Sequence, residues 1–167
     1  MHQWTNYPSS WTSGDPCDSW ANVTCSGGRV TSLKLSGVNL QGILSSSIGQ
    51  LSQLVILDLS FNSGLGGPLP TKIGDLKELT TLYAPHYSLL SSLLPLILAG
   101  CSFTGEIPKE IGNLLQLWFL RLNMNGFEGA IPTNTSKLVK LNELNLATNK
   151  LTGSMPDLSS MTNLNVV

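Results

Sequence analysis

The sequence is poor in charge and nearly lacks histidine. Only 11% of its 167 residues are charged, the net charge is −1, and no run of lysine or arginine occurs. A basic surface for nucleic acid or for a membrane is therefore not expected. The two histidines, His2 and His86, have no cluster of cysteine or acidic residues beside them. We therefore expect no metal site, no cofactor and no histidine-based catalysis, so the chain should not be an enzyme.

The sequence also lacks an export signal and a membrane-spanning run. The chain begins Met1-His2-Gln3-Trp4, without the positive and apolar regions of a signal peptide. The uncharged stretch 83–104 contains Pro85 and Pro95. Its dense apolar run is nearer 10 residues than the roughly 20 that a spanning helix needs. We expect neither a signal peptide nor a transmembrane helix within this sequence.

Leucine, by contrast, recurs at regular spacing. The pattern L-x-x-L-x-L-x-x-[N/C/V]-x-[L/F]-x-G occurs five times, and successive starts are 24, 39, 24 and 24 residues apart. The starts are Val30, Leu54, Leu93, Leu117 and Leu141, and a sixth repeat opens at Leu164. A period in the twenties with this spacing predicts a leucine-rich-repeat solenoid over residues 30–164. Residues 165–167 would begin a truncated sixth repeat.

The second and third leucines of each repeat are two residues apart, so on a strand they point to the same side. These pairs are Leu33/Leu35, Leu57/Leu59, Leu96/Leu98, Leu120/Leu122 and Leu144/Leu146. One short strand cannot bury such a pair, whereas stacked repeats bury all of them in a continuous core. We predict an α/β-type repeat solenoid with short parallel strands on its concave face and 3₁₀ or extended segments on its convex face.

Three residues after the leucine pair of each repeat comes a position that is usually asparagine. Asn62, Asn125 and Asn149 occupy it in three repeats, and Val38 and Cys101 are the variants. An asparagine amide can bond backbone groups of its own turn and of the next coil, while Cys101 reads as a small buried structural residue. The glycine and proline that come next suit a permissive turn and an extended segment without ladder bonds. Thr135-Ser136 replaces the Ile-Gly pair of the other repeats, which we interpret as a local weakening of the convex side.

Residues 1–29 precede the first repeat and are rich in tryptophan. A solenoid has an open end that must be covered, and a small cap closed by a disulfide between Cys17 and Cys25 would cover it. Such a bond implies an oxidising compartment. The core of this cap would contain Trp4, Trp11 and Trp20.

Several of these segments resemble a known family. The cap segment WTSGDPCDSWANVTC (residues 11–25) and the LxGxIPxxIGxLxxL repeats resemble plant leucine-rich-repeat receptor-like serine/threonine protein kinases. LILAGCSFTG (residues 96–105) is similar to the third repeat of one subfamily. The resemblance implies the membrane-distal ectodomain of a single-pass plasma-membrane receptor whose kinase domain is absent from this chain. The implied partners are a protein or peptide ligand and a co-receptor, with no direct membrane contact by this segment.

Two other interpretations stay open. A secreted inhibitor of the cell-wall-hydrolase-inhibitor type shares the cap and the repeat, but it would be a complete solenoid with more repeats. A non-functional truncated receptor fragment would explain the incomplete sixth repeat at Leu164. In an exported chain, the sequons at Asn22 and Asn134 are candidates for glycosylation.

The long step between the second and third starts contains 14 extra residues. Both Leu79-x-x-Leu82 and Leu93-x-x-Leu96 fit the opening of the third repeat, and deleting residues 83–96 restores a regular pattern. The segment could be a gene-model artefact, which we favour, a genuine loop at the edge of the solenoid, or, least in keeping with its length, a membrane segment.

The residues between the core leucines face outward on the concave surface, where solenoids bind partners. Most of them are small. Large aromatic, sulfur-containing and arginine side chains stand out because such residues are enriched at binding hot spots. Our candidate ligand-binding residues are Asp58, Phe61, Phe119, Arg121, Asn123 and Met124.

Overall fold

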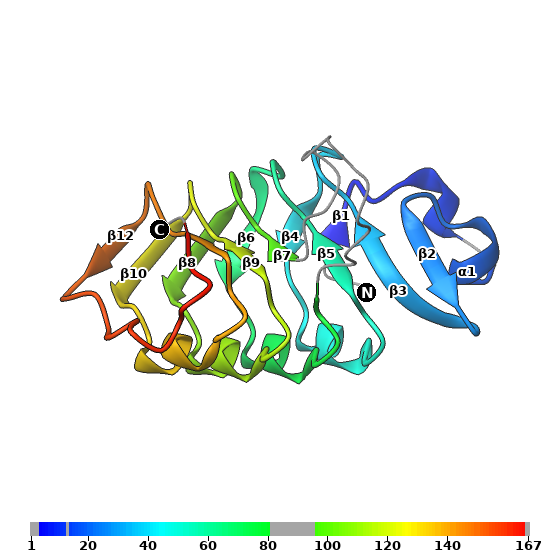
Figure 1. Cartoon of the computed structure of the whole chain (residues 1–167). Coiled ribbons are helices and arrows are strands. Elements are labelled where there is room, and N and C mark those ends of the chain that lie inside the picture. The colour runs from blue at the N-terminus through cyan, green and yellow to red at the C-terminus, as the bar shows by residue number, and fades with distance from the viewer. Residues whose placement is uncertain (1–3, 13, 81–95, 166–167) are drawn as a thin grey trace.

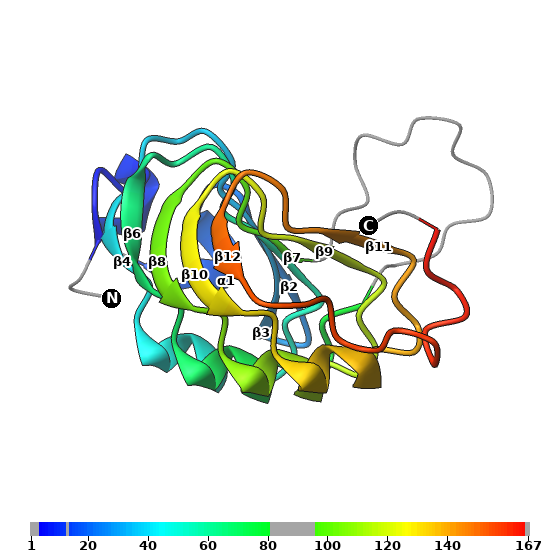
Figure 2. The same ribbon diagram turned by 90° about the vertical axis from the view of Figure 1, so that its left-hand side faces the viewer.

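The computed structural model describes residues 4–12, 14–80 and 96–165, which coil into a solenoid of successive repeats (Figure 1). Each of the first four repeats contributes one strand to each of two sheets and one short 3₁₀ helix. Seen along the solenoid, the sheets lie on opposite sides and the helices line a third side (Figure 2). We call these the inner sheet, the outer sheet and the turn row. The predicted leucine-rich-repeat solenoid is confirmed.

The inner sheet is built by the predicted leucine strands in the order β11-β9-β7-β5-β3-β2. Its strands are β2 (Val23–Ser26), β3 (Arg29–Lys34), β5 (Ile56–Asp58), β7 (Leu96–Ile97), β9 (Phe119–Arg121) and β11 (Glu143–Asn145). All neighbours are parallel except β2 and β3. The register aligns the second leucines of the repeats, which are buried: Leu33, Leu57, Leu96, Leu120 and Leu144. Leu146 is only half-buried, in the last repeat.

The outer sheet was not predicted from the sequence. Its strands are β1 (Trp4–Thr5), β4 (Gln41–Ile43), β6 (Gly64–Pro68), β8 (Ser102–Glu106), β10 (Gly126–Ala130) and β12 (Lys150–Thr152). Apart from the antiparallel β1, they pair in parallel in chain order. The prolines Pro70, Pro108 and Pro132 follow these strands and lie outside the ladder in extended conformation, as predicted. The strands pair because stacking brings equivalent extended segments of successive repeats side by side.

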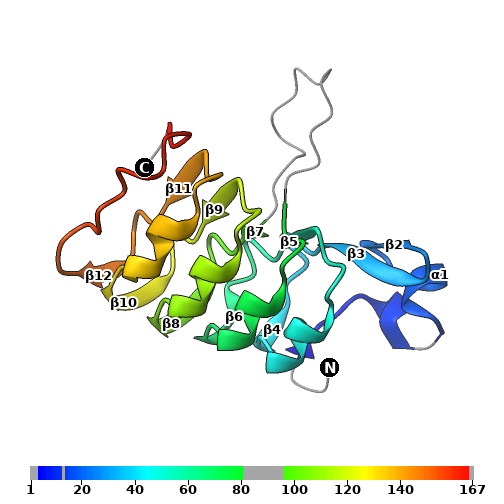
Figure 3. The same ribbon diagram turned by 60° about the horizontal axis from the view of Figure 1, so that its bottom comes forward.

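The turn row carries the prolines that were assigned to the extended segments. It consists of η2 (Ser46–Gln50), η3 (Thr71–Asp75), η4 (Lys109–Asn113) and η5 (Thr133–Lys137), stacked one on the next (Figure 3). Pro70, Pro108 and Pro132 are the N-cap residues of the last three, with φ between −59° and −67°. Proline suits this place because its ring fixes φ near −65°.

Glycines bring neighbouring turns into backbone contact. A Cβ atom at Gly74 would overlap the Glu110 carbonyl, and one at Gly112 would overlap that of Asn134. The next residue in this column is Ser136, the predicted weak point. Turn η5 forms with Thr135 buried, and the predicted weakening of its stability stays a prediction. Serine is accommodated because, within the described residues, no further 3₁₀ helix stacks on η5.

The asparagine ladder is confirmed, with one change of direction. The Asn62 Nδ2 group donates to the carbonyls of Leu35 (2.7 Å) and Leu59 (2.8 Å), and its Oδ1 accepts from the Leu40 N–H (2.9 Å). Leu35 and Leu40 belong to the preceding coil, not to the next one. The same pattern recurs at Asn125 and Asn149. Each amide therefore ties its own coil to the one before it.

Leu79 occupies the position of the leucine that opens a repeat. The Leu79 N–H bonds the Leu76 carbonyl (3.1 Å), as Leu54 bonds Leu51 and Leu117 bonds Leu114. Leu79 therefore closes the turn of the second repeat. Leu93 lies outside the described residues, as does the predicted insertion except for its last residue, Leu96, which is a core residue of β7. The 14 extra residues thus fall between Leu79 and Leu96.

The cap comprises η1 (Ser9–Thr12), the short helix α1 (Pro16–Ser19) and strand β2. The predicted disulfide joins Cys17 to Cys25 with their Cα atoms 5.4 Å apart. Asp15 caps α1 by accepting from the Cys17 N–H (2.8 Å). Across the described ranges, every helix is too short to cross a lipid bilayer.

Candidate ligand-binding face

The six predicted ligand-binding residues lie on the inner sheet in two groups. Asp58 ends β5 and Phe61 follows it, whereas Phe119 and Arg121 lie in β9 and are followed by Asn123 and Met124. Strand β7 separates the groups, because Ile97 pairs with Asp58 on one side and with Arg121 on the other. The third repeat therefore forms the middle of the candidate face.

Arg121 is already engaged within the chain. Its Nε donates to Glu143 Oε1 (2.5 Å) and its Nη2 donates to Glu143 Oε2 (2.8 Å), a bidentate pair. The hydrogen bonds that Arg121 donates to Glu143 raise the pKa of Arg121. Glu143 is not among the candidates from the sequence, because it meets Arg121 diagonally across two strands. In the strand register Arg121 lies opposite Asn145, and Glu143 lies opposite the half-buried Phe119.

Asp58 is held by a short polar chain. Its Oδ1 accepts from the Ser60 N–H (3.0 Å) and from the Ser60 hydroxyl (2.6 Å). The Ser60 and Ser36 hydroxyl oxygens lie 2.8 Å apart. The carboxylate is thus oriented by residues of two adjacent repeats, which reduces its availability to a ligand.

Phe61 and Met124 share an unusual backbone conformation. Both have positive φ, 56° and 57°, in a column that is otherwise Gly37, Gly100 and Thr148. The Phe61 side chain is 63% exposed and that of Met124 is 51% exposed. Left-handed conformations are unfavourable for residues with a Cβ atom. The two largest side chains of this column are therefore both strained and exposed.

Asn123 retains unused hydrogen-bonding capacity. Its backbone carbonyl accepts from the Gly100 N–H (3.1 Å) and from Asn125 Nδ2 (3.2 Å). Its side-chain Oδ1 is buried, and it has no hydrogen-bond partner among the residues that the structure describes. A buried polar group without a partner is unfavourable, so this amide gains by meeting one.

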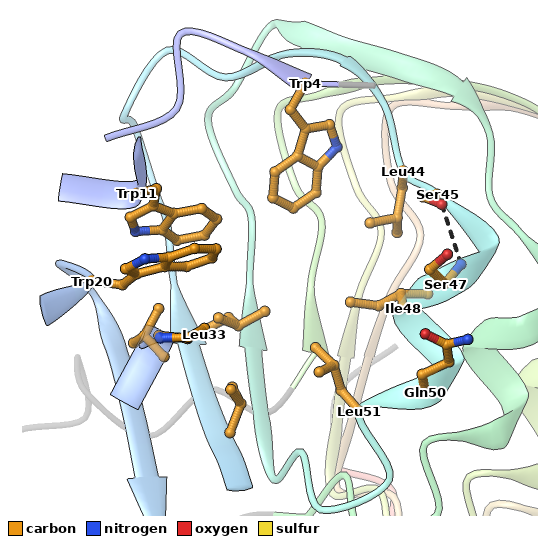
Figure 4. A pocket seen from close by; sticks show the side chains of 13 residues that line it. Trp4, Trp11, Trp20, Leu33, Leu44, Ser45, Ser47, Ile48, Gln50 and Leu51 are labelled. Carbon is orange, nitrogen blue, oxygen red and sulfur yellow. Dashed lines mark hydrogen bonds between the residues drawn. The ribbon is translucent and has the colours of Figure 1, made fainter. Parts of the chain in front are cut away.

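A second feature was not foreseen from the sequence, namely a cavity of about 320 Å³ under the cap (Figure 4). The tryptophans expected in the cap core form its wall. Trp11 stacks on Trp20 with ring centroids 4.6 Å apart, and Trp4 lies 6.3 Å from Trp11. Leu44 and Ile48 of the first repeat line the other side. The cavity is mostly apolar and lies away from the candidate face.

The remaining sequence candidates have clear places. Cys101 is buried and donates to the Leu59 carbonyl (3.2 Å). Burial raises the pKa of its thiol, which keeps the thiol protonated and unreactive, as expected for a structural cysteine.

Of the two candidate glycosylation sites, Asn22 is exposed and Asn134 is half-buried. Among the described residues, no group of three or more His, Cys, Asp or Glu side chains could hold a metal. His2 and His86 lie outside these residues.

Comparison with known proteins agrees with this architecture. Residues 96–114 match the leucine-rich-repeat family. The receptor-like serine/threonine-protein kinase GSO2 of Arabidopsis thaliana is 39% identical over 109 residues, which are 64% of this chain and 8% of GSO2. The ectodomain of the Arabidopsis thaliana receptor kinase SOBIR1 is 30% identical, with a TM-score of 0.75, over 92% of this chain and 80% of that chain.

Another similar structure is that of the Arabidopsis receptor kinase HAESA with the peptide hormone IDA and the co-receptor SERK1. It is 26% identical, with a TM-score of 0.67, over 95% of this chain and 29% of that chain. This chain thus spans only a small part of GSO2 but most of the SOBIR1 ectodomain. The chain belongs to the leucine-rich-repeat family of plant receptor-like kinases and resembles their ectodomains.

Proposed function

We propose that this chain is a non-catalytic recognition module that binds a peptide or protein ligand on the outward face of its inner sheet. The observation that carries the proposal is the pair Phe61 and Met124, large and exposed on a face where Arg121 is already paired with Glu143. Exposed apolar side chains are characteristic of binding hot spots. Solenoids use such extended faces for recognition.

The relatives support a receptor role. HAESA was solved with a peptide hormone and a co-receptor, which are partners of the kind we propose for this chain. GSO2 is a receptor-like kinase. We place the module on the extracellular side of a plant plasma membrane, where the Cys17–Cys25 disulfide would be stable. Kinase activity would belong to another part of the parent protein.

A glycan placed on the inner sheet tests the proposal. The substitution Ala147→Thr turns Asn145 into a sequon on that sheet. The double substitution Glu128→Asn and Ala130→Thr creates one on the exposed side of β10, in the outer sheet. Both variants and the parent chain would be secreted from plant cells and screened with a display library of random linear peptides. Intact mass would confirm that each new glycan is attached.

We expect the parent chain and the outer-sheet variant to retain the same peptides, and the inner-sheet variant to lose them. The reason is that a glycan on the inner sheet covers the outward side chains without entering the core. Equal binding by all three proteins would place the binding surface elsewhere. Absence of any retained peptide would contradict peptide recognition itself.

A further inference from the structure

We propose that Phe61, Gly100, Asn123 and Met124 form a subsite for an extended peptide segment that carries a large uncharged apolar side chain. We call these four residues the apolar shelf. The proposal rests on the proposed function and specifies the chemistry of the ligand for that same face.

Backbone hydrogen bonds place the shelf residues side by side across three repeats. The Phe61 N–H donates to the carbonyl of Ala99 (2.8 Å), the residue before Gly100. The Gly100 N–H donates to the carbonyl of Asn123 (3.1 Å), the residue before Met124. Phe61, Gly100 and Met124 thus follow one another in one column, with the glycine in the middle.

The glycine leaves room that the Phe61 ring uses. A Cβ atom on Gly100 would lie 2.9 Å from Cδ1 of Phe61. The ring therefore lies over the glycine. A side chain that enters between Phe61 and Met124 would meet apolar atoms on two sides.

The backbone of the shelf is strained without a matching gain in packing. Phe61 and Met124 hold φ values of 56° and 57°, which glycine adopts at the equivalent position of the first and third repeats. Since both side chains are exposed, burial in the core does not offset the strain. Gly37, Gly100 and Thr148 share the positive φ, so the turn of the repeat imposes it, and the unusual feature at Phe61 and Met124 is a large exposed side chain in that conformation. Strained backbone positions of this kind are concentrated at ligand-binding and catalytic sites.

The charges around the shelf point to an uncharged ligand group. Arg121 is bound bidentately by Glu143, and the Asp58 Oδ1 atom accepts two hydrogen bonds from Ser60. A ligand carboxylate would have to displace Glu143 to pair with Arg121, and a ligand ammonium would have to compete with Ser60 for Asp58 Oδ1. An apolar side chain needs no such exchange.

Asn123 supplies the polar contact of the shelf. The amide adjoins Met124, and its Oδ1 is buried without a partner among the described residues. Rotation of the side chain would bring its oxygen and nitrogen to a ligand main chain, which offers both N–H and carbonyl groups. An extended peptide segment therefore satisfies the amide while its side chain enters the shelf.

The test uses glycine as the replacement, because glycine relieves the strained backbone and removes the side chain. The variants Phe61→Gly and Met124→Gly would be compared with Thr148→Gly, which changes the same column outside the shelf, and with Leu115→Ala, an exposed apolar residue next to the turn row. The probes are linear peptides selected from a random display library against the parent chain. Affinity would be measured by titration calorimetry and melting temperature by circular dichroism.

We expect selected peptides to share a large apolar residue. Both shelf variants should melt at or above the temperature of the parent chain and bind at least tenfold more weakly, whereas both controls should bind within twofold of the parent. Peptides that bind all variants equally, or acidic peptides whose binding requires Arg121, would overturn the shelf while leaving peptide recognition intact. If no peptide is selected, the proposed function fails together with the shelf.

Discussion

The backbone N–H of Leu65 donates a hydrogen bond to the carbonyl of Asn62 at 2.9 Å. The equivalent N–H groups of other repeats donate instead to a ladder asparagine one coil further on, and they belong to Leu40, Phe103 and Phe127. The second repeat has one more residue in this turn, so the local bond is within reach. Cys101, which has no side-chain oxygen, therefore leaves no backbone N–H unpaired at the ladder position.

The substitution Asn125→Cys should be far more harmful than the natural cysteine at position 101. It removes the oxygen that accepts from the Phe103 N–H (3.0 Å), and an unpaired buried N–H costs about 1–3 kcal/mol. Equilibrium unfolding in urea would measure the loss, with Cys101→Ala as the control, expected to lose less than Asn125→Cys. Equal losses would show that the Leu65 bond does not compensate for the missing oxygen.

Gly112→Ala should destabilise the turn row. The new Cβ atom would overlap the carbonyl oxygen and the Cβ atom of Asn134, and overpacking of this kind costs roughly 1–3 kcal/mol. The matched control is Ser136→Ala, at the equivalent position of the last turn, which removes only a hydrogen bond to the Thr133 carbonyl. Thermal melting of the two variants compares them directly. A melting temperature for Gly112→Ala equal to that of the control would refute the close contact.

Arg121 and Glu143 should show a measurable coupling energy. A double-mutant cycle with Arg121→Gln and Glu143→Gln should give about 1 kcal/mol or less at low salt, because the Arg121 side chain is one-third exposed and solvent screens the pair. Added salt should reduce this value. The pKa of Arg121 is raised in the folded state, so its contribution is complete below the unfolded pKa and is lost only as pH rises through the folded value. A coupling that disappears between pH 6 and pH 9 would contradict this.

Removal of residues 83–96 should leave the solenoid intact. Leu82 would then follow Leu79 at the spacing that separates Leu57 from Leu54, and it would take the place of Leu96 in the inner sheet. We expect a melting temperature equal to or above that of the full chain, with less aggregation, since fewer leucines would lie outside the repeats. A lower melting temperature would show instead that the extra residues stabilise the third repeat.

The sequence predicts most of the core because leucines two residues apart point to the same side of a strand. Leu57 and Leu59, for example, could only be buried together by stacking. Cys17 and Cys25 were likewise paired from their place before an open end. The third repeat was assigned to Leu93 because two leucines fit the same pattern. The bond from Leu79 to the carbonyl of Leu76 shows that Leu79 takes such a position, and Leu93 lies outside the described residues.

The outer sheet and the Arg121–Glu143 pair escaped prediction for a different reason. Segments such as Gly126–Ala130 show no alternation of apolar and polar residues, so their ladder depends on stacking alone. Glu143 reaches Arg121 diagonally between repeats, and comparison of like positions straight across the repeats does not reveal such contacts. The cavity beside Trp11 has no pattern in the sequence at all.

The glycine contacts of the turn row also influence the shape of the inner sheet. Gly74 and Gly112 let consecutive turns approach to backbone contact, and the asparagine ladder fixes the spacing of the same repeats near the strands. The bend of the solenoid is set by the difference between these two spacings. A larger residue in the turn row would change this curvature and, with it, the distance between Phe61 and Met124. We therefore expect residues of the turn row to influence the geometry of the apolar shelf from the opposite side of the repeat.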